Sequence, residues 1–144
     1  GAKEVAIYAK ITIKKKESGK KETYIALLNS GSYPRTDSPA LKDLRFPYVR
    51  VPKDFAEKEL EAKLREYRKG RYVDTASSYC VCLLDLEEKP VVCIDNCLLI
   101  SEDGLDIAII PYELLKEMKI LLDPDEDSWI HKESGKKIKS LEIP

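Results

Sequence analysis

The stretch YIALLNSGSYP, residues 24–34, contains the sharpest change of character in the chain. It begins with apolar residues, including an aromatic and a β-branched one, which is typical of a buried strand. The apolar run stops at Asn29, which is followed by Ser30, Gly31 and Ser32, all of them residues that favour a tight turn. The pattern therefore predicts a buried strand that places an amide side chain at its exit.

The segments on either side of this stretch complete the local picture. Residues 5–13 alternate between apolar and polar with period two, which indicates a half-buried strand, and a charged turn around Gly19 follows. We therefore expect a hairpin that delivers Asn29 at its end. Beyond it, residues 33–52 are expected to form an irregular segment interrupted by prolines, with a long loop at 33–48 and one short strand that includes Tyr48, Val49 and Val51.

The rest of the chain is expected to contain short strands and two helices. The clearest helical pattern is DFAEKELEAKLREYRK, residues 54–69, which is amphipathic and is followed by Gly70. Further strands are expected at 79–86, 91–100, 105–111 and 120–124, a second helix at 112–119, and a polar tail at 125–144. Many short strands separated by turns predict a mainly β domain, a small barrel or a sandwich. A length of 144 residues suits a single domain.

The composition argues against a nucleic-acid partner and against a membrane-spanning helix. Lysine and arginine together number 25 against 26 acidic residues, so no net positive field attracts the chain to nucleic acid. No apolar run approaches the roughly 20 residues that a membrane-spanning helix needs, and we expect a soluble, cytoplasmic protein without a membrane partner. The chain has no Gln and 35% charged residues, which favours a heat-adapted source.

Three interpretations are possible for the state of the four cysteines, which are Cys80, Cys82, Cys93 and Cys97. Buried free thiols are favoured, because free cysteine is among the most buried residue types. A zinc site that uses all four is the second reading, although the spacing lacks the glycines of common zinc knuckles. Disulfides are the third, and they would be consistent with a thermophilic source.

A resemblance to a known family follows from three segments in order along the chain. If residue 29 were aspartate, residues 29–32 would match the D-[ST]-G-[AS] signature of aspartic peptidases. With the segments at 51–60 and 106–124, the chain resembles the retropepsin-like aspartic peptidases, in particular short single-domain forms of archaea and bacteria, from about residue 5 to residue 124. In that family the apolar element before the second helix packs behind the catalytic turn.

The resemblance implies a closed β-barrel and a homodimer, because one chain supplies only one signature. Residue 29 of each subunit would take the place of a catalytic aspartate, with Ser30, Gly31 and Ser32 forming the supporting turn. Two such carboxylates share one proton and activate a water molecule, without a metal or another cofactor. The implied substrate is a polypeptide in an extended conformation, which the enzyme hydrolyses as an endopeptidase.

Three departures from the family pattern affect this interpretation. Asn29 stands where the aspartate should be, Pro111 replaces a glycine, and the loop at 33–48 is longer than usual. Asparagine cannot ionise, so the chain with Asn29 is expected to be inactive. Either the aspartate was exchanged to prevent self-cleavage, which a Gly1 start such as a cleaved tag leaves would favour, or the chain is a natural non-catalytic module that holds extended peptides.

A second segment competes for the catalytic role. YVDTASSY, residues 72–79, contains Asp74, Thr75 and Ala76, which also resemble the signature, with alanine in place of glycine. By its position in the chain we expect it to belong to a substrate-covering hairpin, or flap, rather than to the catalytic turn. The single histidine, His131, is expected at the surface or at a dimer contact, and Trp129 is expected to pack the tail onto the barrel.

Overall fold

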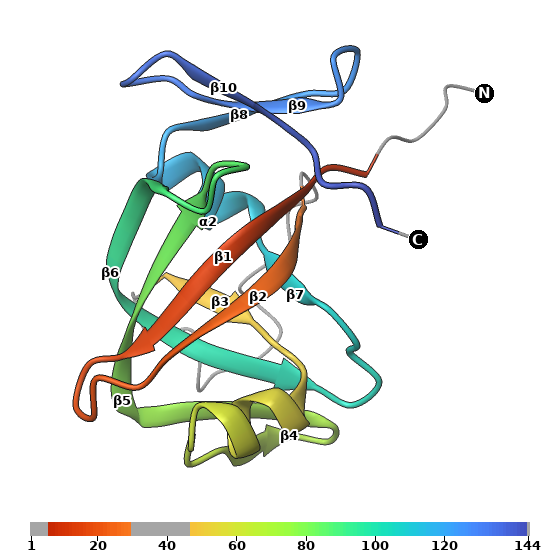
Figure 1. Ribbon diagram of the computed structural model, residues 1–144. Coiled ribbons are helices and arrows are strands. Elements are labelled where there is room, and N and C mark those ends of the chain that lie inside the picture. Colours follow the sequence, from red (N-terminus) through yellow and green to blue (C-terminus); the bar gives the residue numbers. More distant parts are fainter. Residues whose placement is uncertain (1–5, 30–46, 144) are drawn as a thin grey trace.

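A computed structural model describes residues 6–29 and 47–143, and these residues are mainly β (Figure 1). The strands are β1 (Tyr8–Lys15), β2 (Lys21–Leu28), β3 (Tyr48–Arg50), β4 (Arg65–Arg68), β5 (Arg71–Leu84), β6 (Pro90–Glu102), β7 (Ala108–Ile110), β8 (Ile120–Asp123), β9 (Ser128–His131) and β10 (Lys136–Lys139). The helical elements are short: the π-helical turn η2 (Phe55–Glu59) and the helix α2 (Tyr112–Glu117).

Six strands close into a barrel in the order β1, β2, β7, β3, β6 and β5. Antiparallel pairing of β5 with β1 completes the ring, and β4 pairs with β5 outside it. The expected mainly β closed barrel with one or two helices is confirmed, and both helical elements are short. No helix among the described residues is long and apolar enough to cross a membrane.

The hairpin of β1 and β2 forms as the alternation in the sequence predicts. The two strands pair antiparallel from Tyr8 opposite Leu27 to Lys14 opposite Lys21. Gly19 in the connecting turn has a φ of 74°, which costs glycine little because it has no Cβ. The inward-facing residues of β1 are buried, and they include Ile11 and Ile13 at 0% exposure.

The sequence-based helix at residues 54–69 is wrong over most of its length. Within that range only residues 54–59 are helical, namely Asp54 and η2, and Glu61 just beyond them has a φ of 56°, which ends any helix. The chain then forms β4, in which Arg65 lies opposite Val73 of β5. Pairing with the edge of β5 and burial of Leu60 at 0% exposure outweigh the high helix propensity of this segment.

The expected polar tail at 125–144 is also corrected by the structure. β9 and β10 pair with β8 in a three-stranded antiparallel sheet that lies next to α2 (Figure 1). Trp129 on the central strand is fully buried, and Ile138 is 6% exposed. Both belong to the same apolar core as the barrel strands, so this segment is part of the domain.

Candidate active site

Asn29 lies directly after β2, at the point where β2 runs beside β7. These two strands pair in parallel, with Leu28 opposite Ile110. The backbone N–H of Asn29 donates a hydrogen bond to the carbonyl oxygen of Ile110 at 3.0 Å. Residue 29 is partly exposed, while its backbone is fixed by the hydrogen bond to β7.

The ends of β2 and β7 next to residue 29 are built from buried core residues. Ala26 and Leu28 of β2 face inward, as do Ala108 and Ile110 of β7, and each is at most 3% exposed. Pairing fixes these strands on both sides of the contact, since β1 borders β2 and β3 borders β7. A residue at this strand end therefore has a well-defined backbone position, which a catalytic group requires.

Pro111 connects β7 to α2 directly behind the contact with Asn29. It adopts an extended conformation with a φ of −72°, and its carbonyl oxygen accepts hydrogen bonds from Leu114 and Leu115 at the start of α2. Proline is tolerated at a helix start because the N–H that it lacks has no partner within the helix. A proline is therefore compatible with the local geometry at this position, where the resemblance leads one to expect glycine.

The other residues of the predicted turn, Ser30, Gly31 and Ser32, lie outside the described residues. The same is true of most of the predicted loop at 33–48, of which only its end at residues 47 and 48 is described. The short strand expected around Val49 is present as β3, which pairs with both β6 and β7.

Asp74 of the rival segment is fully buried, and its carboxylate is surrounded by donors from its own chain. Its Oδ1 accepts hydrogen bonds from the backbone N–H groups of Ala76 at 2.9 Å and Ser77 at 3.2 Å. Its Oδ2 accepts one from the hydroxyl of Tyr79 at 2.6 Å and one from the N–H of Lys63 at 3.3 Å. A carboxylate held in this way has a structural role and no route to a substrate.

The hydrogen bonds of Asp74 lie where the ladder between β5 and β6 is interrupted. The pairing of β5 with β6 shifts register between Asp74 and Tyr79, which leaves backbone groups without their usual partners. The carboxylate supplies the missing acceptors. Burial, together with the hydrogen bond to Asp74, raises the pKa of the Tyr79 hydroxyl far above its ordinary value, so this donor stays protonated.

The residues predicted to belong to a flap hairpin lie on a strand of the hairpin of β4 and β5. Asp74, Thr75 and Ala76 are in the first half of β5, directly after the residues that pair with β4, and Thr75 and Ala76 are exposed. The turn of this hairpin is at Gly70. In the sequence, that hairpin is indicated by Gly70 between two segments rich in tyrosine and arginine. The amphipathic pattern before Gly70 predicted a helix instead, so the hairpin was missed.

The cysteine prediction is corrected in part. Cys82 and Cys93 lie opposite each other on β5 and β6 and form a disulfide, whereas Cys80 and Cys97 are free thiols. Cys97 is 1% exposed, and burial raises its pKa to about 12. Among the described residues, no group of three or more His, Cys, Asp or Glu side chains is arranged to hold a metal ion.

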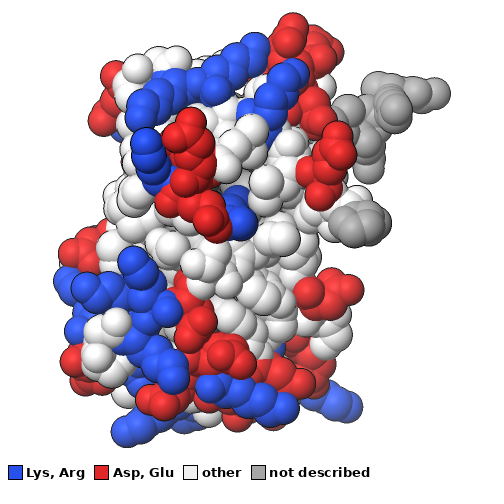
Figure 2. All heavy atoms as spheres, viewed as in Figure 1, with Lys and Arg blue, Asp and Glu red and all other residues white. Residues whose placement is uncertain are grey.

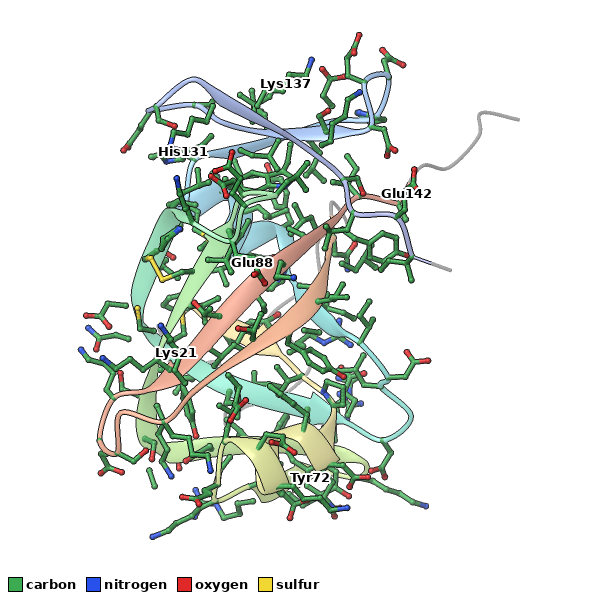
Figure 3. The ribbon with its side chains drawn as sticks, viewed as in Figure 1. Lys21, Tyr72, Glu88, His131, Lys137 and Glu142 are labelled. Carbon is green, nitrogen blue, oxygen red and sulfur yellow. A yellow bond between two sulfur atoms is a disulfide. The ribbon has the colours of Figure 1, made fainter. Side chains whose placement is uncertain are left out.

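The expectation for His131 is also corrected. The side chain is only 8% exposed, and its Nδ1 lies 2.7 Å from the hydroxyl oxygen of Ser134 in the turn between β9 and β10. Figure 3 shows His131 at the end of the sheet of β8, β9 and β10. Its register partners, Ile120 and Lys136, explain its burial between two strands.

Comparison with known proteins shows the fold. No family model matches the chain, and no curated protein matches it in sequence. Among solved structures, the chain is similar to the crystal structure of the retroviral protease-like domain of Ddi1 from Leishmania major, with a TM-score of 0.55 and 14% sequence identity, over 97% of each chain. The chain therefore has a retropepsin-like fold: a mainly β, closed barrel with two short helices.

Proposed function

We propose that this chain is an aspartic endopeptidase domain of the retropepsin-like kind, which forms its dyad across a homodimer and is inactive with asparagine at position 29. The observation that carries the proposal is the position of Asn29. It follows β2 directly, its backbone is bound to Ile110 of the parallel strand β7, and α2 begins immediately after. This is the arrangement that the family resemblance predicts around a catalytic aspartate.

The proposed chemistry needs two carboxylates at residue 29, one from each subunit. Close together, they cannot both ionise, so they share one proton. The ionised carboxylate takes a proton from a water molecule, which attacks the peptide carbonyl, and the protonated one donates to the leaving nitrogen. Asn29 has the shape of aspartate but carries no charge at neutral pH and cannot accept the proton of water.

The direct test is the variant Asn29→Asp, compared with the unchanged chain and with Asn29→Ala. We expect Asn29→Asp to cleave denatured casein, most rapidly below neutral pH, and statine-containing inhibitors to block the cleavage. Both comparison proteins should be inactive. A folded Asn29→Asp dimer without any cleavage from acidic to neutral pH would refute the enzyme proposal.

The dimer is tested separately by sedimentation velocity. Each subunit supplies one residue 29, so the proposed dyad requires a two-fold dimer with these residues facing each other. A protein that stays monomeric at concentrations well above those of the cleavage assay contradicts this part of the proposal.

A second candidate function is a non-catalytic module that holds extended peptides. Asn29 and Pro111 favour it, because both replace residues of the family's catalytic pattern. In that case Asn29→Asp would also fail to cleave, whereas the unchanged chain would bind extended peptides. Cleavage by Asn29→Asp separates the two functions, because an inactivated peptidase and a binding module would both bind unstructured peptides through the unchanged chain.

A further inference from the structure

The edge of β2 that faces away from β1 is only partly covered. β1 pairs with β2 along residues 21–27, but β7 pairs with it only from Ala26 to Leu28. Within the parts of the chain that the structure describes, residues 21–25 of β2 therefore have no strand on their second side. An uncovered strand edge is a template for pairing with another chain.

The direction of the free backbone groups follows from the bonds farther along the strand. The N–H of Leu28 donates to Ile7 beside β1, and the N–H of Asn29 donates to Ile110 of β7. Because these directions alternate along a strand, Thr23 and Ile25 point their backbone N–H and C=O groups away from β1, toward β7 and the uncovered edge. The parallel pairing of Ala26 with Ala108 uses the C=O of Ile25, so the groups left for another strand are the N–H and C=O of Thr23 and the N–H of Ile25.

A groove with a volume of about 460 Å³ runs along this edge. Its lining residues are Lys10, Thr23, Tyr24, Ile25, Asp106, Ile107 and Ile143. Two of these are large apolar residues with unusual exposure, Ile25 at 37% and Ile143 at 39%. Figure 2 shows an uncharged strip on this side of the molecule, between regions crowded with charged residues.

The charges at the rim of the groove are not balanced. The ammonium group of Lys10 is bound to Glu88 at 2.7 Å, and Glu88 lies beside β1 in Figure 3. Asp106 is exposed and has no ion pair within the described residues. A basic side chain at the end near Asp106 would therefore complement the groove.

We propose that this groove binds an extended peptide segment of another protein, which adds as a strand to the free edge of β2. The peptide would exchange backbone hydrogen bonds with Thr23 and accept one from the N–H of Ile25. It would place an apolar side chain on Ile25 and Ile143, and bring a lysine or arginine to Asp106. This is the β-augmentation mode of peptide recognition. The groove has walls on both sides, β2 on one and residues 106–107 on the other, which fits a single strand better than the surface of a second barrel.

The proposed peptide site is independent of the proposed catalytic function. Residue 25 precedes residue 29 by four positions, which is about 13 Å along a strand. Lys10, Thr23 and Ile25 alternate with the buried residues of their strands and thus lie on the outer face of the barrel. Binding here can be measured in the chain as it stands, with Asn29 in place.

The test uses a synthetic, N-acetylated peptide, Lys-Val-Thr-Val-Thr, titrated into isotope-labelled protein and followed by amide chemical shifts. We expect saturable shifts at Thr23 and Ile25. The variant Ile25→Lys should weaken binding about tenfold or more, because it removes the apolar contact. Leu86→Lys is the matched control, since Leu86 is 57% exposed in the turn before β6 and should leave the affinity unchanged.

Two further arms identify the occupant. Asp106→Lys should weaken the lysine peptide about three- to fivefold and favour the same peptide with Glu in place of Lys. A peptide with N-methyl groups on alternate residues should not bind, because it cannot complete the ladder. The absence of saturable shifts at millimolar peptide overturns the proposal, as do shifts only around Asn29. So does a sedimentation result in which Ile25→Lys turns a dimer into a monomer, since a second copy would then be the occupant.

Discussion

The buried hydrogen bond between Tyr79 and Asp74 lies where the pairing of β5 with β6 shifts register. Its contribution to the stability of the barrel can be tested quantitatively. The hydroxyl of Tyr79 lies 2.6 Å from Oδ2 of Asp74, and both residues are 0% exposed. We consider the variants Tyr79→Phe, Asp74→Asn and the double variant. Tyr79→Phe removes one donor and leaves the carboxylate with the three backbone donors of Lys63, Ala76 and Ser77.

The expected magnitudes follow from the partners that each variant leaves behind. A hydrogen bond to a charged, buried acceptor contributes about 1.5–3 kcal/mol, so Tyr79→Phe should lower the free energy of unfolding by about 2 kcal/mol. Asp74→Asn keeps an acceptor for Ala76 and Ser77 but places an amide NH2 group against the N–H of Lys63. We expect it to cost about 2–4 kcal/mol.

Urea denaturation of the four proteins gives the coupling energy between the two residues. The loss in the double variant should be smaller than the sum of the single losses by about 1–2 kcal/mol, because the same bond is removed in both. With a urea dependence of about 1–3 kcal/mol per molar, Tyr79→Phe alone should shift the midpoint by roughly 1 M. A coupling energy below about 0.5 kcal/mol would refute the role assigned to this bond.

Three further predictions concern other parts of the domain. Reduction of the Cys82–Cys93 disulfide, which joins residues 11 apart, should lower the free energy of unfolding by about 3 kcal/mol through chain entropy, as measured by thermal unfolding with and without a dithiol. An unchanged melting temperature in the reduced protein would contradict this. Stability should fall above pH 9, because the native state keeps a proton on Cys97, whose pKa rises from its ordinary 9.0 to about 12, while the unfolded chain releases it. Cys97→Ala should make the decline between pH 9 and 12 shallower by at most about 1.4 kcal/mol per pH unit, and identical slopes would show that Cys97 does not contribute. Trp129→Ala should cost about 3–5 kcal/mol in chemical denaturation if the sheet of β8, β9 and β10 shares the barrel core, and less than 1 kcal/mol if it does not. Trp129→Phe is the milder control, since the indole N–H has no acceptor within the described residues.

The segments that the sequence predicted well are those in which local pattern and tertiary environment agree. The first strand of the hairpin, β1, alternates between polar and apolar residues, and its apolar face is buried in the barrel. The run of apolar residues before Pro111 is buried on β7, and the following amphipathic segment forms α2. In these places the sequence pattern reflects which side chains are buried, so the secondary structure could be predicted from the sequence alone.

The errors occur where partners distant in the sequence decide the outcome. Residues 54–69 have the propensity of a helix, but the free edge of β5 and the carboxylate of Asp74 hold most of this segment in other conformations. The 125–144 segment reads as polar because its apolar residues are widely spaced, yet Trp129 and Ile138 meet on paired strands. A turn at Gly135, with a φ of 73°, was the local sign of that hairpin.

The sequence by itself determined the β-rich class, the first hairpin, and the placement of Asn29 at the exit of a strand, because alternation and turn chemistry act over a few neighbouring residues. The strand itself, β2, is buried only near its end, at Ala26 and Leu28. Only the tertiary structure decided that Ile110 lies beside Asn29, that Cys82 meets Cys93, and that Asp74 is a buried acceptor for its own barrel. Those contacts depend on the register of strands that lie far apart in the chain. Register is set by the fit of the whole closed sheet, which no local pattern contains.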